Sequence, residues 1–451
     1  MFAQRRTKRS ERRRRGRRLR ETIPLEAHAE IPQDDDRAAP ISILQRQEAD
    51  RLSEFSQLRY ERMAASPFAF LRGAAAIMAS DLAMVARTPI RTQLCGDAHL
   101  SNFGMFSSQE RRLMFDINDF DETLPGPFEW DVKRLAASVV VAAEELELAD
   151  GAAFKAARAA VKSYRKTMAR LAAMPTLDVW FASLDVDSIL DNSGKSELSA
   201  ATRKARKKAR IRTSDTAADK LTEKGAHVRR FRSEPPILIR PEGVAHDEAM
   251  EGLAGLYAQY LSTLPPDRLA LLARFSVTDV AHKVVGVGSV GTRALVLLLE
   301  SGDGEPLLLQ VKQAGESVLS AHLGPSELTN GGQRVVLGQQ AMQAGGDPFL
   351  GWTRGTQTDY YVRQLKDMKG AIDLSTLGAS SLKQYARLCG AVLARAHART
   401  GDASLITGYL GEGESFDAAV AEFATGYARL TAHDHKLLRE FVSQGSESSN
   451  L

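Results

Sequence analysis

Length, composition and charge limit the kinds of protein that this chain can be. With 451 residues, 43% of them hydrophobic and 26% charged, it has the composition of a globular protein and enough length to bury a large core. No apolar run reaches the roughly 18 residues that a membrane-spanning helix needs, and no apolar stretch follows the basic N-terminus as in a signal peptide. Two cysteines cannot build a disulfide framework, so we expect a cytoplasmic protein.

The net charge of +4 is concentrated near the N-terminus. Residues 5–20 hold 11 of the 60 Lys and Arg residues and a single acid, Glu11, so the rest of the chain has 49 basic and 55 acidic residues. A block of like charges without apolar anchors repels itself. We therefore expect residues 1–40 to form a disordered basic tail and linker. This tail either makes weak contacts with nucleic acid or another anionic surface, or has no specific role.

Hydrophobic periodicity and turn residues predict the following elements in chain order. The first part contains helices over Ile41–Met63 and within Phe68–Arg87, a strand over Arg91–Leu94, a hairpin of Phe103–Phe106 with Arg111–Ile117, and a buried helix over Trp130–Leu148. The second part contains strands over Thr278–Val285, Ala294–Leu299, Leu307–Val311 and Tyr360–Leu365, then helices over Leu382–Arg399 and Phe416–Leu430. The sequence therefore predicts an α+β fold.

These elements predict two lobes. Residues 41–269 form a larger helical lobe that carries a catalytic loop and a metal-binding hairpin, and residues 270–366 form a smaller β-rich lobe that binds a nucleotide. The helices of residues 367–451 then return to the larger lobe.

One polar cluster, Gly96-Asp97-Ala98-His99-Leu100-Ser101-Asn102, has the spacing of a phosphoryl-transfer loop. In D-x-x-x-x-N, the aspartate orients or deprotonates the attacking hydroxyl, and the asparagine reaches a metal ion. We therefore expect Asp97 and His99 to be catalytic and Asn102 to bind a metal. The alternative is a hydrogen-bonded turn in which these side chains satisfy backbone donors.

A second acid is needed to complete a Mg²⁺ site, because this ion prefers carboxylate and phosphate oxygens. Asp119 is followed by Phe120 and is the candidate that most resembles the metal-holding aspartate of a D-F-G element. Asp121 lies on the same side if the preceding strand continues that far, and Asp116 is the substitute. Arg72 is a further candidate, as a cation for substrate or phosphate.

Glycines follow much later in the chain, in V-V-G-V-G-S-V-G-T-R. Here Gly286, Gly288, Ser289 and Gly291 lie between two predicted strands, and Lys312 ends the strand after them. A dinucleotide fingerprint requires a helix straight after its glycines, whereas strand–glycines–strand–lysine is the order of a kinase phosphate-covering loop. The alternative is a glycine-rich hairpin with a solvent-facing lysine.

Lys312 lacks the acidic partner that a kinase helix normally supplies. The helix expected at Gln333–Gln343 contains neither Glu nor Asp, and Glu316 and Glu327 are the nearest alternatives. This gap counts against efficient catalysis more than against nucleotide binding. A further segment, Ala396–Asp402, is interpreted as a helix end with Gly401 as its C-cap and His397 packed or near the cleft.

Several segments closely resemble an uncharacterised bacterial family, domain of unknown function 2252. The matching motifs include CGDAHLSNFG, FDINDFDETLPGPFEWDVKRLAAS, VGVGSVGTR and LARAHARTGD, and the resemblance runs from about Arg15 to the C-terminal helices. It implies a protein-kinase-like fold similar to that of aminoglycoside phosphotransferases, in circularly permuted order because the catalytic loop precedes the glycines. It also implies that Asp97 is the base, that Asn102 and Asp119 bind metal, and that the helix with Asp131 supports the loop. Cys95 stands where that loop usually has histidine.

We therefore expect a kinase-like phosphotransferase that uses ATP and Mg²⁺ and acts on an unidentified acceptor, more readily a small molecule than a protein. Three alternatives remain open at this stage. They are a catalytically weak, pseudokinase-like nucleotide-binding protein, a nucleotidyl transferase, and a metal-dependent hydrolase that uses Asp97, His99 and Asp116.

Overall fold

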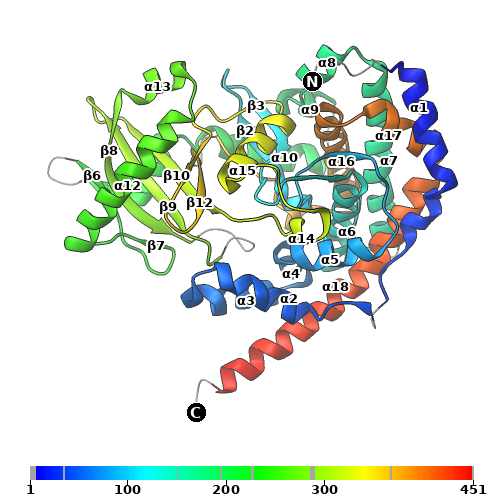
Figure 1. The fold of residues 1–451 in the computed structure, drawn as a ribbon, viewed down its shortest axis with the longest axis horizontal. Coiled ribbons are helices and arrows are strands. Elements are labelled where there is room, and N and C mark those ends of the chain that lie inside the picture. Colours follow the sequence, from blue (N-terminus) through cyan, green and yellow to red (C-terminus); the bar gives the residue numbers. More distant parts are fainter. Residues whose placement is uncertain are drawn as a thin grey trace.

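The computed structural model describes residues 7–33, 36–149, 151–192, 196–224, 228–284, 290–365 and 368–448. A six-stranded antiparallel sheet with its covering helices lies on one side of the molecule, and a body of long helices lies on the other (Figure 1). The α+β class that the sequence predicts is confirmed. Within the residues described, no helix is both long and apolar enough to cross a membrane.

The helical body is built on four long helices. They are α6 (Glu129–Glu145), α7 (Ala152–Ala173), α16 (Ala379–Thr400) and α18 (Ser415–Ser448). On α6 the run from Ala136 to Ala143 is entirely buried, because the helices α7, α16 and α18 and the shorter helix α4 (Pro67–Gly73) all contact α6. Burial on all sides explains why this run of α6 is apolar except for Ser138.

Shorter elements pack around this body or against the sheet. In the first half of the chain they are α1 (Arg9–Arg18), α2 (Pro40–Arg46), α3 (Ser56–Ala64), α4 (Pro67–Gly73), α5 (Ala75–Met84), β1 (Arg91–Leu94), β2 (Phe103–Ser107), β3 (Leu113–Ile117) and β4 (Leu124–Pro127). Further along they are α8 (Thr176–Phe181), α9 (Val186–Asn192), α10 (Glu197–Arg210), α11 (Ser214–Leu221), β5 (Thr222–Lys224), β6 (Arg229–Phe231), α14 (Ser320–Leu323) and α17 (Ala403–Leu410).

The large sheet has the strand order β11-β12-β10-β9-β8-β7. Its strands are β7 (Leu238–Ile239), β8 (Phe275–Lys283), β9 (Ala294–Ser301), β10 (Pro306–Ala314), β11 (Gly351–Arg354) and β12 (Asp359–Gln364). Helix α15 (Gly331–Met342) packs against β11 and β12 and also contacts α16 of the helical body. The strands predicted around Ala294, Leu307 and Tyr360 are therefore confirmed.

Both faces of the sheet are covered, which explains the continuous apolar sequence of β9. Leu297 and Leu299 face the helices α12 (Val244–Ser262) and α13 (Pro266–Leu272), whereas Val296 and Leu298 face α11 and Phe231. A strand that is buried on both faces does not alternate between polar and apolar residues.

The sheet unit is larger than the predicted unit that starts at residue 270. β7, which pairs with β8, and the helices α11, α12 and α13, which cover the sheet, all begin before that boundary. A sheet with two apolar faces needs a cover on each of them, and the preceding helices supply it.

The expectation of a disordered segment over residues 1–40 is wrong for most of the residues described there. Helix α1 lies along α17 at the edge of the helical body (Figure 1), and Arg12 forms an ion pair with Asp402 at 2.8 Å. Arg20 donates to the carbonyl oxygens of Gly408 and Tyr409 at 2.7 and 2.6 Å. Arg12 and Arg20, which would be repelled by their neighbours in a free tail, thus have acceptors on the body.

Candidate active site

The loop between β1 and β2 is fixed at its start by α6. The carboxylate of Asp131 accepts hydrogen bonds from the backbone N–H groups of Cys95 and Gly96 at 2.8 and 3.1 Å. Gly96 has φ of +85°, and a Cβ at this position would lie 2.2 Å from the carbonyl oxygen of Glu122. Only glycine combines that backbone conformation with such a close approach. The conformation of the turn before Asp97 therefore depends on Gly96 and on the carboxylate of Asp131.

A buried histidine stands behind Asp131. His397 on α16 places its Nε2 3.2 Å from Oδ2 of Asp131, and its Nδ1 lies 2.9 Å from the hydroxyl oxygen of Tyr164. Gly401 caps the same helix by donating to the carbonyl oxygen of His397 at 2.8 Å. His397 is thus a packed residue at a helix end, as predicted, and it contributes to the site by orienting Asp131.

Asp97 is held by an arginine that the sequence analysis did not single out. Arg134 on α6 contacts Oδ1 of Asp97 through Nε and Nη2, at 2.8 and 2.7 Å. Oδ2 lies 3.5 Å from Nε2 of His99. Burial lowers the pKa of His99 to about 4, so this imidazole is neutral near pH 7. Arg134 lies three residues after Asp131 on one face of α6, a spacing that could have revealed it.

Asn102 closes the same loop. Its Nδ2 donates to the carbonyl oxygen of Asp97 at 2.5 Å, and its own carbonyl oxygen accepts from the N–H of Asn118, just after β3, at 2.8 Å. β2 and β3 form the predicted hairpin, with Phe103 paired to Ile117. The hairpin therefore carries the segment of Asp119 and Asp121 back to the loop of Asp97.

Lys312 on β10 reaches this acidic segment from the sheet. Its ammonium pairs with Oδ2 of Asp121 and lies 4.0 Å from Oδ2 of Asp119. Tyr361 on β12, the neighbour of Lys312 in the strand register, donates its hydroxyl hydrogen to Oδ1 of Asp121 at 2.8 Å. β3 ends at Ile117, so both carboxylates reach the lysine because the chain turns after the strand, not because the strand continues.

The charges in this group shift one another's titration. Burial alone would lower the pKa of Lys312, but the two carboxylates raise it above its ordinary value. Burial opposes ionisation of Asp121 as well, yet the Lys312 ammonium lowers the pKa of Asp121 to about 2. Burial and the neighbouring Asp121 raise the pKa of Asp119. Asp121 is thus the acid that stays ionised beside the lysine.

A single cavity of about 370 Å³ joins the two groups. The predicted site residues that line it are Arg72, Asp97, His99, Asn102, Asp119, Asp121 and Lys312. Arg72 on α4 has a buried Nε that no acceptor among the described residues contacts. The loop and the acidic segment therefore meet Lys312 in one cavity, although about 200 residues of chain separate them from this lysine.

Several residues line the cavity without having been predicted, among them the cations Arg51, Arg363 and Lys369. Arg51 enters from the N-terminal segment, and Arg363 and Lys369 enter from β12 and the residues after it. The glycine of the predicted loop that is described, Gly291, accepts a hydrogen bond from the N–H of Leu52 at 2.8 Å. No recognisable spacing marks these cations in the sequence, because they come from separate elements.

Other predicted residues are not part of the cavity as described. Gly286, Gly288 and Ser289 lie outside the described residues. Asp116 is buried away from the cavity lining, where it pairs with Arg395 and accepts from the N–H of Ala344 at 2.9 Å. Its carboxylate is therefore committed to the packing between β3 and α16, and Asp116 does not substitute as a metal ligand here.

Helix α15 carries no acid, as predicted, and Lys312 has its acidic partner elsewhere. α15 carries Arg334, which donates to the carbonyl oxygens of Asp121, Thr123 and Gly315 at 2.8, 2.7 and 3.0 Å. Lys312 pairs with Asp121 instead of with Glu316 or Glu327. Arg334 of α15 therefore holds the acidic segment next to the sheet by hydrogen bonds to backbone carbonyl groups. Asp121 of that segment is the partner of Lys312.

The described residues contain no group of three or more His, Cys, Asp or Glu side chains that could hold a metal ion by themselves. A Mg²⁺ ion at this site would be held by the carboxylate of Asp119 and the amide oxygen of Asn102, whose Nδ2 is already used by the Asp97 carbonyl. Phosphate oxygens would have to complete its shell, as they do when Mg²⁺ enters together with a nucleotide. The donor set fits such a shared ion, because both side chains line the cavity.

Comparison with known proteins gives the chain a family. Residues 51–441 match the model of domain of unknown function 2252, described as an uncharacterized protein conserved in bacteria. The chain belongs to this family. The match covers the loop, the acidic segment, the glycines and Lys312. No curated protein and no solved structure matches the chain.

Proposed function

We propose that this member of domain of unknown function 2252 is a kinase-like phosphotransferase that uses ATP and Mg²⁺ and acts on a small-molecule acceptor. The observation that carries the proposal is the shared cavity in which Lys312 meets Asp119 and Asp121 beside Asp97 and Asn102. The order of elements supports it. A glycine-rich segment joins β8 to β9, the lysine lies on β10, and helix α15 follows, which is the order of a protein-kinase nucleotide site in a circularly permuted chain.

The chemistry would be divided among these side chains. Lys312 and the glycine segment would hold the phosphates of ATP, and Asp119 and Asn102 would hold Mg²⁺, which neutralises charge on the phosphate oxygens. Asp97 uses Oδ1 for Arg134, so Oδ2 is the oxygen that would take the proton from the acceptor hydroxyl. That hydroxyl oxygen forms a bond to the γ-phosphorus as the bond between this phosphorus and the oxygen bridging to ADP breaks.

A second function, nucleotide binding with little or no turnover, is favoured by a specific observation. The buried Arg134 contacts Oδ1 of Asp97 through both Nε and Nη2, so one oxygen of the carboxylate that would act as the base is already engaged in an ion pair. Lys312 also lacks an acid on α15. Nucleotidyl transfer would use the same residues, with the α-phosphate of ATP next to the acceptor instead of the γ-phosphate. Hydrolysis by Asp97, His99 and Asp116 has less support, because Asp116 is bound to Arg395.

Transfer assays with ATP labelled at either the γ- or the α-phosphate test the proposal. Label from γ-labelled ATP should reach an acceptor in a panel of hydroxyl-bearing metabolites, and Asp97→Asn should remove this transfer while nucleotide affinity stays within about twofold. Asp187→Asn, which alters a carboxylate paired with Arg206 outside the cavity, is the matched control. Transfer of α-label would identify a nucleotidyl transferase. ATP binding without transfer of either label would select the binding protein.

A further inference from the structure

The N-terminus of helix α5 borders the candidate active site. Gly73 at the end of α4 and Ala75, the first residue of α5, both line the cavity. The helix has ten residues, and no side chain caps its first turn. Within the described part of the chain, the backbone N–H groups of Ala75, Ala76 and Ile77 have no acceptor. Uncapped N–H groups at the positive end of a helix dipole favour a negatively charged ligand.

Arg72 adds a positive charge next to this helix N-terminus. Its guanidinium has no hydrogen-bond acceptor among the residues that the structure describes, and its Nε is buried. Burial lowers the pKa of Arg72, and the more distant carboxylate of Asp97 offsets only part of this effect. That carboxylate is already in contact with Arg134. Protein groups therefore balance the charge of Arg72 only in part.

His99 gives an independent indication of a ligand at the same place. It lines the cavity and is 4% exposed, and its Nδ1 has no hydrogen-bond partner in the described ranges. The ring lies against Phe68 of α4, with the ring centroids 6.5 Å apart. Burial is the main cause of its lowered pKa, and the nearby charges of Arg134 and Arg72 contribute. Because buried polar atoms usually have a partner, an unpaired Nδ1 in a cavity wall marks a contact for a polar ligand.

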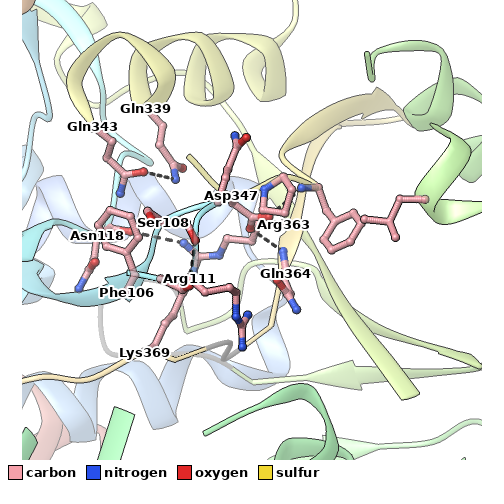
Figure 2. A pocket seen from close by; sticks show the side chains of 15 residues that line it. Phe106, Ser108, Arg111, Asn118, Gln339, Gln343, Asp347, Arg363, Gln364 and Lys369 are labelled. Atoms are coloured by element: carbon pink, nitrogen blue, oxygen red, sulfur yellow. Dashed lines mark hydrogen bonds between the residues drawn. The ribbon is translucent and has the colours of Figure 1, made fainter. Parts of the chain in front are cut away.

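Arg363, a cation elsewhere in the same cavity, differs from Arg72 in its surroundings. Figure 2 shows Arg363 close to Asp347 in a neighbouring cavity, which shares this arginine with the active site. Burial alone would lower the pKa of Arg363, but its neighbours raise it, and these are Tyr361 and the carboxylates of Asp119, Asp121 and Asp347. Arg363 thus has its negative charge within the protein, and a further anion is better placed at Arg72.

We propose that the acceptor of the phosphotransferase is a hydroxyl compound with a negatively charged group, and that this group binds to Arg72 and the N-terminus of α5. The inference rests on the proposed function and specifies its substrate class. The hydroxyl group would lie at Asp97 and His99, since Nε2 of His99 is 3.5 Å from Oδ2 of Asp97, the oxygen left for the acceptor proton. A carboxylate and a phosphate ester both fit, because guanidinium and backbone N–H groups bind either of them.

Calorimetric titration of the full chain tests the inference with three-carbon probes that differ in charge. They are D-glycerate, sn-glycerol 3-phosphate and uncharged glycerol, each added with and without saturating Mg-ADP. At least one of the anionic probes should bind under both conditions, and glycerol should give no heat at the same concentration. The probe that binds tells a carboxylate ligand from a phosphate ligand.

Variants of the anion site locate the binding. Arg72→Met removes the charge and keeps the apolar stem, so it should weaken binding about tenfold while the midpoint of urea denaturation stays close to that of the parent protein. Arg203→Met, at an exposed position of α10, is the matched control. Ala75→Asp places a carboxylate in the first turn of α5, where it stabilises a helix and repels an anion. It should abolish binding without unfolding the chain.

Equal affinities of Arg72→Met and Arg203→Met would overturn the inference, and a lower urea midpoint in Arg72→Met would then show that this arginine only stabilises the end of α4. Binding that Mg-ADP abolishes would overturn it too, because the anion site would belong to the nucleotide. A chain that binds Mg-ADP but neither anionic probe would overturn it and leave the proposed function intact. A chain that binds an anionic probe through Arg72 but binds no ADP would refute the proposed function and support the anion site.

Discussion

Lys312 illustrates how one residue can connect a fold with its chemistry. It is 3% exposed and lies beside two carboxylates. Its positive charge balances their negative charge in the interior, with or without a bound nucleotide. A buried cation of this kind holds the acidic segment against the sheet, and in the proposed function the phosphates of ATP would compete for it. Its removal therefore affects stability as well as binding, and the two effects can be measured separately.

Replacing Lys312 with methionine should lower the free energy of unfolding by about 2–3 kcal/mol, because Asp121 and Asp119 would lose their cation while staying partly buried. The double variant Lys312→Met with Asp121→Asn should be more stable than Lys312→Met alone. Urea denaturation measures both values. Lys383→Met, which changes an exposed lysine on α16, should stay within about 0.5 kcal/mol of the parent protein. Additive losses in the double variant would disprove the pairing.

His99 makes the protein sensitive to acid. Its pKa is lowered to about 4 in the folded protein from 6.5 in the unfolded chain, so the unfolded chain binds the proton more readily between these values. The free energy of unfolding therefore decreases by about 3 kcal/mol as the pH falls from 6.5 towards 4.

Urea denaturation at a series of pH values checks this sign. His99→Gln should lose markedly less stability than the parent protein between pH 6.5 and pH 4, whereas His433→Gln, at an exposed position of α18, should behave like the parent. Parallel curves for the parent and His99→Gln would show that the imidazole is not desolvated.

At the scale of elements, α6 and α16 act together as the support of the Asp97 loop. Asp131 and Arg134 of α6 contact the loop, and His397 of α16 contacts Asp131. An amide at position 131 can accept only through its single oxygen and would turn its NH₂ group towards one of the two backbone donors. Asp131→Asn should therefore weaken this part of the structure by about 1–3 kcal/mol.

Hydrogen exchange locates that effect. The amides of Cys95 and Gly96 should exchange faster in Asp131→Asn, while the amides of β9 and β10 keep the protection of the parent protein. Glu144→Gln, at an exposed position near the end of the same helix, should leave the loop unchanged. Unchanged exchange at Cys95 and Gly96 in Asp131→Asn would contradict the supporting role of α6.

Helix α1 is attached to the body by close backbone contact. A Cβ added at Gly16 would lie 2.1 Å from the carbonyl oxygen of Leu405 on α17. Gly16→Ala should therefore release α1 and speed tryptic cleavage after its arginines several-fold, whereas Ser10→Ala, at an exposed position, should not. Cleavage at equal rates in the two variants would mean that the contact does not hold the helix.

At the scale of the whole molecule, the site depends on segments that are distant in sequence. The pattern of residues predicted the hairpin of β2 and β3, the strands of the sheet and a lysine near the end of β10, because local periodicity and turn residues determine these features. The same pattern could not predict that Arg51, Arg363 and Lys369 face the cavity, since nothing local links them. It also failed for α1, because the partners of its arginines are distant in sequence, such as Asp402 for Arg12 and the carbonyl oxygen of Ala173 for Arg9.

Spacing alone was equally insufficient for the acids. Asp116, Asp119 and Asp121 are alike as a sequence pattern, but the fold gives Asp116 to Arg395 and the other two to Lys312. Tertiary partners decide which carboxylate is structural and which lines the cavity. The same reasoning explains Arg134, whose role became visible only when α6 was packed behind the loop.

The most direct test of the central claim is calorimetric titration of Mg-ATP into the full chain. We predict binding at one site, at least tenfold weaker in Lys312→Met and no longer dependent on Mg²⁺ in Asp119→Asn, with Lys383→Met equal to the parent. Absence of binding in the parent protein, or equal affinity in Lys312→Met, would contradict the assignment of this cavity to a nucleotide.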